Sequence, residues 1–442
     1  MVPSRPVGLP VQTDGRVWAR EGDSLVPMSM ERQREIFAES GHDFSADICR
    51  TATLDDLDRD AIEDFRRRWV AKSGNSSIGT VQVSQLLHDA ELMVDDRPTY
   101  AALILFGTHR ALGKLLGQAE VVFEYRSSEA SGAAQERREY RAGFFTFYDA
   151  LWNDINKRND LQHYREGLFV LDILTFDERS VREAVLNAVS HRNYQLAGNV
   201  FIRQYPRRLV IESPGGLPVG ITTENILDRQ MPRNRRLAES FQRCGLIERS
   251  GQGMNLMFER SLRQGKRYPD LTGTDQHQVT LTLHGEVREP RFIRFLERVT
   301  EETRESFNAH DLVLLDLIRC ERHIPLDQRD RLRRMRDLGV VESVGRGRGT
   351  RYLLSRRFYA ALDRPGTYTR RRGLDNEESK ALLVKHLRSC GPGGAPVSEL
   401  EEVLPARSRR QIRRLLRELR KEGRVIILGE RRWTRYRLAD DV

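Results

Sequence analysis

The stretch E-A-V-L-N-A-V-S-H-R-N-Y, residues 183–194, decides the interpretation of the fold. A helix over 180–191 would place Glu183, Asn187 and His191 on one face, because these residues lie four apart. Most other positions are apolar, as in a helix that packs on a sheet. A carboxylate can orient or deprotonate water, and a carboxamide oxygen can hold Mg²⁺ against phosphate groups. The stripe therefore indicates phosphate-ester chemistry, although the same spacing also occurs in helices without such a site.

Two glycine-containing segments follow this helix. The first, S-P-G-G-L-P at 213–218, ends a predicted strand, and the second, R-S-G-Q-G at 249–253, precedes a predicted helix. Glycine lets backbone N–H groups approach a phosphate, and a helix N-terminus adds positive partial charge. Either segment alone is equally typical of a turn or a helix start. Their order after 183–194 favours a nucleotide site.

The surrounding patterns predict an α+β domain, with helices on one face of a mixed sheet. Apolar runs predict strands at 101–106, 120–125, 168–173, 200–205, 209–212 and 279–283. The helical period predicts helices at 54–70, 81–92, 141–155, 180–190, 236–244 and 254–262. Alternating residues 7–26 predict a hairpin with its turn at Asp14-Gly15.

The basic excess of the chain lies in its C-terminal third. Residues 301–442 hold 33 Lys+Arg and 22 Asp+Glu, against 41 and 42 in the first 300 residues. A concentrated basic block is typical of a module that binds a polyphosphate backbone. The same element order, two helices and then two strands around a basic turn, occurs over 309–354 and again over 379–438.

Each repeat predicts a DNA-binding helix followed by a basic wing. In the first repeat we expect DNA contacts from Arg329, Arg333, Arg346 and Arg348. In the second repeat we expect them from Arg409, Arg410, Arg413, Arg414, Arg431 and Arg432. The alternative is a pair of protein-binding modules whose arginines are only solvated.

Several classes of protein do not fit this composition. The four cysteines form no C-x-x-C pair, so the spacing predicts neither a zinc finger nor a disulfide framework. No apolar run approaches the ~20 residues of a membrane span, and no signal peptide is evident. The segment 107–115 lacks the spacing and the Ser or Thr of a Walker A loop. We therefore expect a cytoplasmic protein without membrane partners.

Taken in order, the motifs of residues 180–257 resemble the GHKL-like ATPase domain of bacterial RecG C-terminal-like transcriptional regulators. Such proteins resemble Schlafen/AlbA-like proteins at the N-terminus and carry C-terminal winged helices. The resemblance implies a GHKL-like (Bergerat) α/β sandwich followed by two winged-helix domains, with ATP and Mg²⁺ as cofactors. The implied domains are an AlbA-like remnant at 1–40, an ATP-binding domain at 41–285 with its core at 167–285, and winged helices at 290–362 and 373–442.

The resemblance also implies roles for single residues. Glu183 would be the general base and Asn187 the Mg²⁺ ligand. The remaining nucleotide contacts would come from Gly215 and Gly216 at the adenine, from Gly251 and Gly253 in a phosphate lid, and from Arg233 and Asn234. The sequence departs from the family's D-x-G-x-G motif, whose Asp accepts the adenine amino group, because Glu212 or Ser213 stands in place of that Asp and Pro214 in place of the first glycine.

These observations favour an ATP-gated regulator that binds double-stranded DNA, as a homodimer on closure, with slow Mg²⁺-dependent ATP hydrolysis. One alternative is a nucleic-acid-processing or phage-defence protein whose activity lies upstream of Met1. The other is a scaffold with a degenerate nucleotide pocket, which the altered glycine motif would explain.

Overall fold

The computed structural model describes residues 10–13, 15–30, 32–33, 36, 42–129, 132–166, 169–247, 252–344, 350–356, 376–404, 407–429 and 434–439. The chain divides into two compact units, Met1–Val313 and Leu314–Val442. Among the described residues no helix is long and apolar enough to cross a membrane.

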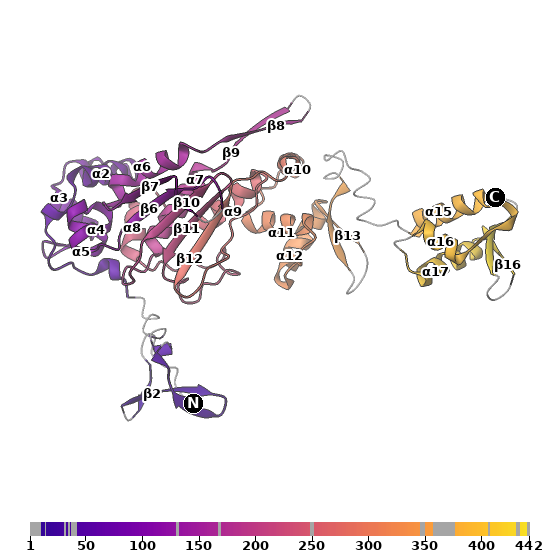
Figure 1. Cartoon of the computed structure of the whole chain (residues 1–442), viewed down its shortest axis with the longest axis horizontal. Helices are drawn as coiled ribbons and strands as arrows, with labels where there is room; N and C mark the ends of the chain where they lie inside the picture. The colour runs from indigo at the N-terminus through magenta and orange to yellow at the C-terminus, as the bar shows by residue number, and fades with distance from the viewer. Residues whose placement is uncertain are drawn as a thin grey trace. The chain divides into compact units, whose positions relative to one another are not determined.

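A five-stranded mixed sheet forms the centre of the first unit (Figure 1). Its strand order is β12-β11-β10-β6-β7, and only the β10–β6 pair is parallel. The strands are β6 (Val121–Tyr125), β7 (Glu136–Tyr140), β10 (Val200–Tyr205), β11 (Arg208–Pro214) and β12 (Gln278–His284). Buried and half-exposed side chains alternate along β10 and β11, so the two faces of the sheet differ. The expected α+β class is confirmed.

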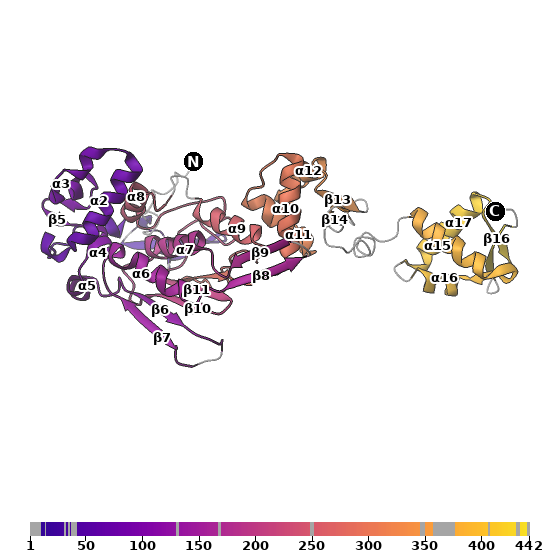
Figure 2. The same cartoon turned by 90° about the horizontal axis from the view of Figure 1, so that it is seen from above.

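Helices cover one face of this sheet (Figure 2). They are α6 (Phe144–Asn156), α7 (Glu178–His191), α8 (Arg235–Arg243) and α9 (Gly253–Arg263). Helix α7 carries the stripe of residues 183–191, and its N-terminus is capped by Asp177, whose carboxylate accepts from the Ser180 backbone N–H at 2.9 Å. Its apolar side chains Val181, Val185 and Val189 are buried in the main core.

A helical region precedes the sheet in the chain and gathers at one end of it (Figures 1 and 2). Its helices are α2 (Arg59–Ser73), α3 (Val83–Asp89), α4 (Tyr100–Phe106) and α5 (His109–Leu115). Two short strands, β4 (Met93–Val94) and β5 (Arg97–Pro98), pair between α3 and α4. An aromatic cluster in the core joins this region to α6 and α8, and it consists of Phe65, Phe106, Phe144, Phe145 and Phe241.

The strand expected at 101–106 was wrong, because these residues form helix α4. All six of their side chains are at most 4% exposed, so the run has no apolar face whose period could distinguish a helix from a strand. The cap is the decisive local feature: the Thr99 hydroxyl accepts from the backbone N–H of Ala102.

A three-stranded N-terminal sheet and the hairpin β8–β9 lie outside the central sheet. At the N-terminus β1 (Gln12–Thr13) pairs with β2 (Arg16–Glu21), which also pairs with β3 (Ser24–Pro27). The expected turn residue Asp14 lies outside the described residues. The hairpin pairs β8 (Leu161–Glu166) with β9 (Phe169–Leu174). The Gln162 side chain anchors it by donating to the Gly285 carbonyl at 2.7 Å.

The remaining elements form two sets, each of which ends with two helices followed by two strands. The first set contains α10 (Pro290–Thr303), α11 (Ala309–Arg319), α12 (Arg329–Asp337), β13 (Val341–Val344) and β14 (Arg351–Leu354), and the boundary between the two units falls within α11. The second set contains α15 (Asn376–Ser389), β15 (Ala395–Pro396), α16 (Val397–Val403), α17 (Arg409–Lys421), β16 (Val425–Leu428) and β17 (Arg435–Leu438). In the second set the strands form a sheet of order β15-β17-β16, and the helices pack around Leu383, Leu400 and Leu416.

Candidate functional site

A cavity of about 380 Å³ lies among α7, α8, α9 and the strands β11 and β12. This volume is within the range of small-molecule sites, about 300–1,000 Å³. Its walls are mainly apolar, with polar groups concentrated along α7 and along the segment that follows β11. The cavity therefore has the usual composition of a pocket for a small molecule that is partly apolar and partly charged.

The three stripe residues of α7 all line the cavity. Glu183, Asn187 and His191 stand one helical turn apart on the wall, as the sequence pattern predicted. Glu183 is 8% exposed. The Asn187 carboxamide makes no hydrogen bond to any residue that the structure describes, so its oxygen and its NH₂ group both remain available to a ligand.

Gly253, the first residue of α9, also lines the cavity and lies directly against Glu183. A Cβ atom at Gly253 would stand 1.8 Å from Glu183 Oε1 and 2.5 Å from Glu183 Cδ. Only a glycine allows the α9 backbone to come this close to the carboxylate. The structure thus joins the acidic residue of one predicted motif to the second glycine of another. The first glycine of that motif, Gly251, lies outside the described residues.

An ion pair fixes the spacing between α7 and α9. The Arg260 guanidinium donates from Nε and Nη2 to the two carboxylate oxygens of Asp177, both at 2.6 Å. Burial alone would raise the pKa of Asp177, but Arg260 and the Ser180 N–H lower it to about 2. Because Asp177 is also the N-cap of α7, one carboxylate holds both helices that carry the site.

The glycines after β11 contribute packing rather than free donors. The Gly215 N–H donates to the His277 carbonyl at 2.6 Å, and the Gly216 N–H donates to the Gln276 carbonyl at 3.1 Å. Gly215 has φ of +97°, and a Cβ there would lie 2.5 Å from Arg233 Nη1. These two N–H groups are therefore already used within the chain, contrary to their expected role toward a ligand. Gly216 still lines the cavity.

Arg233 and Asn234 hold the loops together rather than line the cavity. Arg233 donates to the carbonyls of His191 and Gly216, at 3.0 and 2.8 Å. The Asn234 carboxamide donates to the carbonyls of Ser190 and Arg192. Burial, with a smaller effect of the Arg233 charge, lowers the pKa of His191 to about 4. The cavity therefore presents a neutral imidazole at neutral pH.

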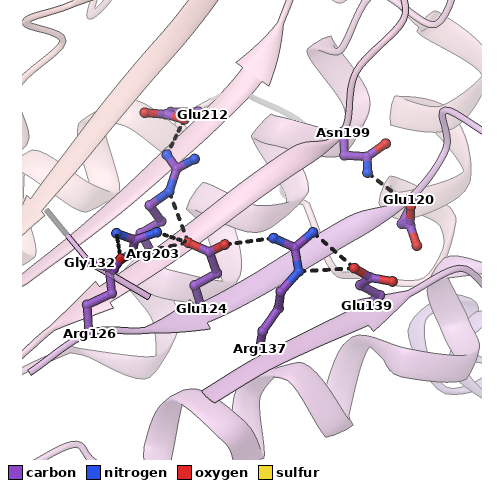
Figure 3. A network of polar contacts seen from close by, with 9 residues as sticks. All are labelled: Glu120, Glu124, Arg126, Gly132, Arg137, Glu139, Asn199, Arg203 and Glu212. Carbon is purple, nitrogen blue, oxygen red and sulfur yellow. Dashed lines mark hydrogen bonds and ion pairs between the residues drawn. The ribbon is translucent and has the colours of Figure 1, made fainter. Parts of the chain in front are cut away.

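Glu212 and Ser213 point to opposite faces of the sheet. The Ser213 hydroxyl donates to the Ala188 carbonyl at 2.9 Å, below α7, and Ser213 lines the cavity. Glu212 instead joins an ionic network on the other face, where Arg203 stands between Glu212 and Glu124 (Figure 3). Arg126 and Arg137 also bind Glu124 in this network. Of the two residues expected at the adenine, only Ser213 is placed at the cavity.

Sequence reasoning missed several cavity residues. Arg229 is exposed, lines the cavity and has no ion pair with any residue in the described part of the chain. An apolar wall on the sheet side is formed by Ile211, Leu271, Val279 and Leu281. The period-2 pattern of β12 could have indicated Val279 and Leu281, but no local signal distinguishes Arg229 from other surface arginines.

The structure describes six of the ten arginines that were predicted to contact DNA. Arg329 and Arg333 on α12, and Arg410 and Arg413 on α17, are exposed and have no ion pair within the described ranges. On α17 two further arginines are paired, Arg409 with Glu401 at 3.4 Å and Arg414 with Glu418 at 3.1 Å. The remaining four, Arg346, Arg348, Arg431 and Arg432, lie outside the described residues.

Comparisons with known proteins agree with part of this picture. Residues 198–283 match the family described as "Putative ATP-dependent DNA helicase recG C-terminal", and residues 34–122 match a domain of unknown function. No curated protein matches. The crystal structure of the DIP2311 protein from Corynebacterium diphtheriae is similar in fold, with 22% identity and a TM-score of 0.58, over 96% of this chain and 75% of its own. The segment that supplies β10, β11, β12 and most of the cavity is thus similar to an ATPase-like domain.

Proposed function

We propose that the cavity binds ATP with Mg²⁺ and that this binding regulates attachment of the C-terminal modules to double-stranded DNA. The observation that carries the proposal is the convergence of Glu183, Asn187 and Gly253 on one cavity, beside a segment similar to an ATPase-like domain. The match begins after α7, so the stripe on α7 supports the assignment independently of it.

The residues at the cavity fit a magnesium nucleotide. Oxygen donors are the ligands that Mg²⁺ prefers, and Asn187 offers a carboxamide oxygen to which no described residue donates. Asn187 would hold the ion, which when bound would neutralise negative charge on the phosphates. In this proposal Glu183 orients a water molecule, Arg229 pairs with a phosphate, and the apolar wall of Ile211, Val279 and Leu281 receives the base.

The C-terminal part of the proposal assigns DNA binding to two winged helices. The elements over 376–438 follow the order helix, strand, helix, helix and two strands, and in this proposal they form a winged helix whose last helix, α17, reads a groove. Arg329 and Arg333 on α12 and Arg410 and Arg413 on α17 are exposed and form no ion pair with the residues that the structure describes, which supports binding to phosphate. The competing function of these modules, contact with another protein, would not depend steeply on salt.

The central test is equilibrium binding of a fluorescent ATP analogue, with and without Mg²⁺, to the full chain and to Asn187→Ala. Loss of a hydrogen bond to a charged group costs about 1.5–3 kcal/mol, so we expect affinity to fall ~10- to 100-fold. Asn153→Ala, at an exposed position on α6, is the matched control and should bind like the wild type. Absence of Mg²⁺-dependent binding by the wild type, or equal affinity in Asn187→Ala, would refute the nucleotide site.

Gating is tested separately by DNA binding at saturating and at zero ATP. We expect the two affinities to differ by at least about fivefold, the lower end of ordinary coupling between sites. Equal DNA affinity in both states would remove regulation while leaving both binding sites in place.

A further inference from the structure

Three metal-ligating side chains meet in the second repeat of the C-terminal unit, far along the chain from the cavity residues. His386 lies in the last turn of α15, Cys390 follows it by four residues, and Glu399 lies in the first turn of α16. The His386 Nε2 atom lies 2.9 Å from Glu399 Oε1, and the Cys390 Sγ atom lies 3.5 Å from the same oxygen. One potential ligand atom from each residue lies within 4.8 Å of the other two.

Two of these three separations are close to those of a tetrahedral metal centre. Zinc binds nitrogen and carboxylate oxygen at about 2.0–2.2 Å and sulfur at about 2.3 Å, so tetrahedral angles place its ligand atoms about 3.4–3.6 Å apart. The sulfur–oxygen distance of 3.5 Å already has this value. The nitrogen–oxygen distance of 2.9 Å would have to open by about 0.5 Å, which a rotation of the Glu399 carboxylate can supply.

The chemistry of the three donors selects the class of metal. Imidazole, thiolate and carboxylate together suit zinc and similar transition metals, whereas Mg²⁺ and Ca²⁺ prefer sites made only of oxygen. Three protein ligands leave a fourth position for water or another ligand. All three residues are half-buried, so an ion can reach them from solvent.

We propose that His386, Cys390 and Glu399 form a binding site for one zinc ion. The ion would link the end of α15 to the start of α16, two helices that pack against the arginine-bearing helix α17. Nearby, the Arg435 guanidinium is held by the carbonyls of Gly393 and Gly394, at 2.8 and 2.9 Å. Its charge also acts on Cys390 and Glu399, for which it favours the anionic forms.

Proton release accompanies binding at this site. Cysteine binds a metal as the thiolate, so on binding the Cys390 thiol loses its proton to solvent. Metal affinity should consequently rise with pH.

Cobalt(II) is the best probe, because a cobalt–thiolate bond absorbs in the near ultraviolet and a tetrahedral cobalt centre absorbs in the visible. The full, tag-free chain is stripped with a chelator and titrated with Co²⁺, and the cobalt is then displaced with Zn²⁺. We expect both absorptions to saturate at one equivalent in the wild type and to be absent from Cys390→Ser. Cys320→Ser, which removes the exposed cysteine in the turn after α11, is the matched control and should keep both.

Two results would overturn the proposal. The first is a wild-type chain that shows no thiolate absorption with excess Co²⁺, and the second is equal absorption in Cys390→Ser. Glu399→Gln controls for loss of folding, because it retains a side-chain oxygen that can accept the hydrogen bonds from His386 and Cys390. With unchanged circular dichroism it should bind Co²⁺ more weakly, whereas wild-type affinity in this variant would exclude Glu399 as a ligand.

Discussion

The contact between Gly253 and Glu183 can be tested by adding a single methyl group. In Gly253→Ala the new Cβ would meet Glu183 Oε1 at 1.8 Å, whereas Cβ contacts below 3.0 Å are essentially never seen. The carboxylate or the start of α9 must therefore move by at least 1.2 Å, the difference between these distances. Glu183 is 8% exposed, so it has little free space to move into.

Overpacking of this kind costs about 1–3 kcal/mol, which exceeds the gain of up to ~1 kcal/mol from replacing glycine by alanine in a helix. We expect Gly253→Ala to lower the free energy of unfolding in urea by about 1–3 kcal/mol. A displacement near 1 Å should also weaken any function of Glu183 by about 100-fold. Gly113→Ala in α5 is the matched control, because its Cβ would have no neighbour closer than 3.8 Å and should leave the chain as stable or more so.

A double-mutant cycle separates this contact from other effects of the substitution. Glu183→Ala removes the atoms that the new methyl group would strike, so the cost of Gly253→Ala should largely disappear in that background. Equal destabilisation by Gly253→Ala with and without the Glu183 side chain would refute the claim that the two residues meet.

Two further predictions concern the ion pair between the site helices and the DNA-binding modules. Arg260→Ala should lower the free energy of unfolding by about 1.5 kcal/mol, the low end for hydrogen bonds to charged groups because Arg260 is 34% exposed. The pKa of Asp177 is lowered from 3.8 to about 2. The ionised carboxylate therefore contributes its full share to the free energy of unfolding above about pH 4, and this share is lost as the pH falls toward 2. The difference in free energy of unfolding between wild type and Arg260→Ala, measured by chemical denaturation, should therefore shrink over that pH range. A difference that stays constant would show that the Asp177–Arg260 ion pair does not cause it. Arg413→Ala should reduce the slope of log affinity for DNA against log salt by about 1, while Lys385→Ala on α15 should leave it unchanged. Identical slopes for wild type and Arg413→Ala, measured by fluorescence anisotropy, would exclude Arg413 as a phosphate contact.

The sequence was sufficient to predict the helices and strands whose patterns depend on residues close together in the chain. The period of 3.6 places Glu183, Asn187 and His191 on one face of α7, and alternation places Leu209, Ile211 and Ser213 on one face of β11. The same alternation already implies that Glu212 faces away from Ser213, so one of the two expected adenine contacts could have been excluded from the sequence. The repeated order of elements at the C-terminus was likewise visible, because it depends on short-range turns and amphipathic periods.

Other features were decided by contacts between distant parts of the chain. Helix α4 has apolar side chains all around it, so only the surrounding core distinguishes it from a strand. The N–H groups of Gly215 and Gly216 are used by carbonyls some sixty residues later in the chain, at His277 and Gln276. The approach of Gly253 to Glu183 depends on how α9 packs against α7, and the meeting of Glu399 with His386 and Cys390 depends on the turn between α15 and α16. The sequence determines which side chains lie on the same face of a helix or strand, because backbone geometry fixes their directions. Which of these faces contact each other is decided by the packing of whole helices and strands in the tertiary structure.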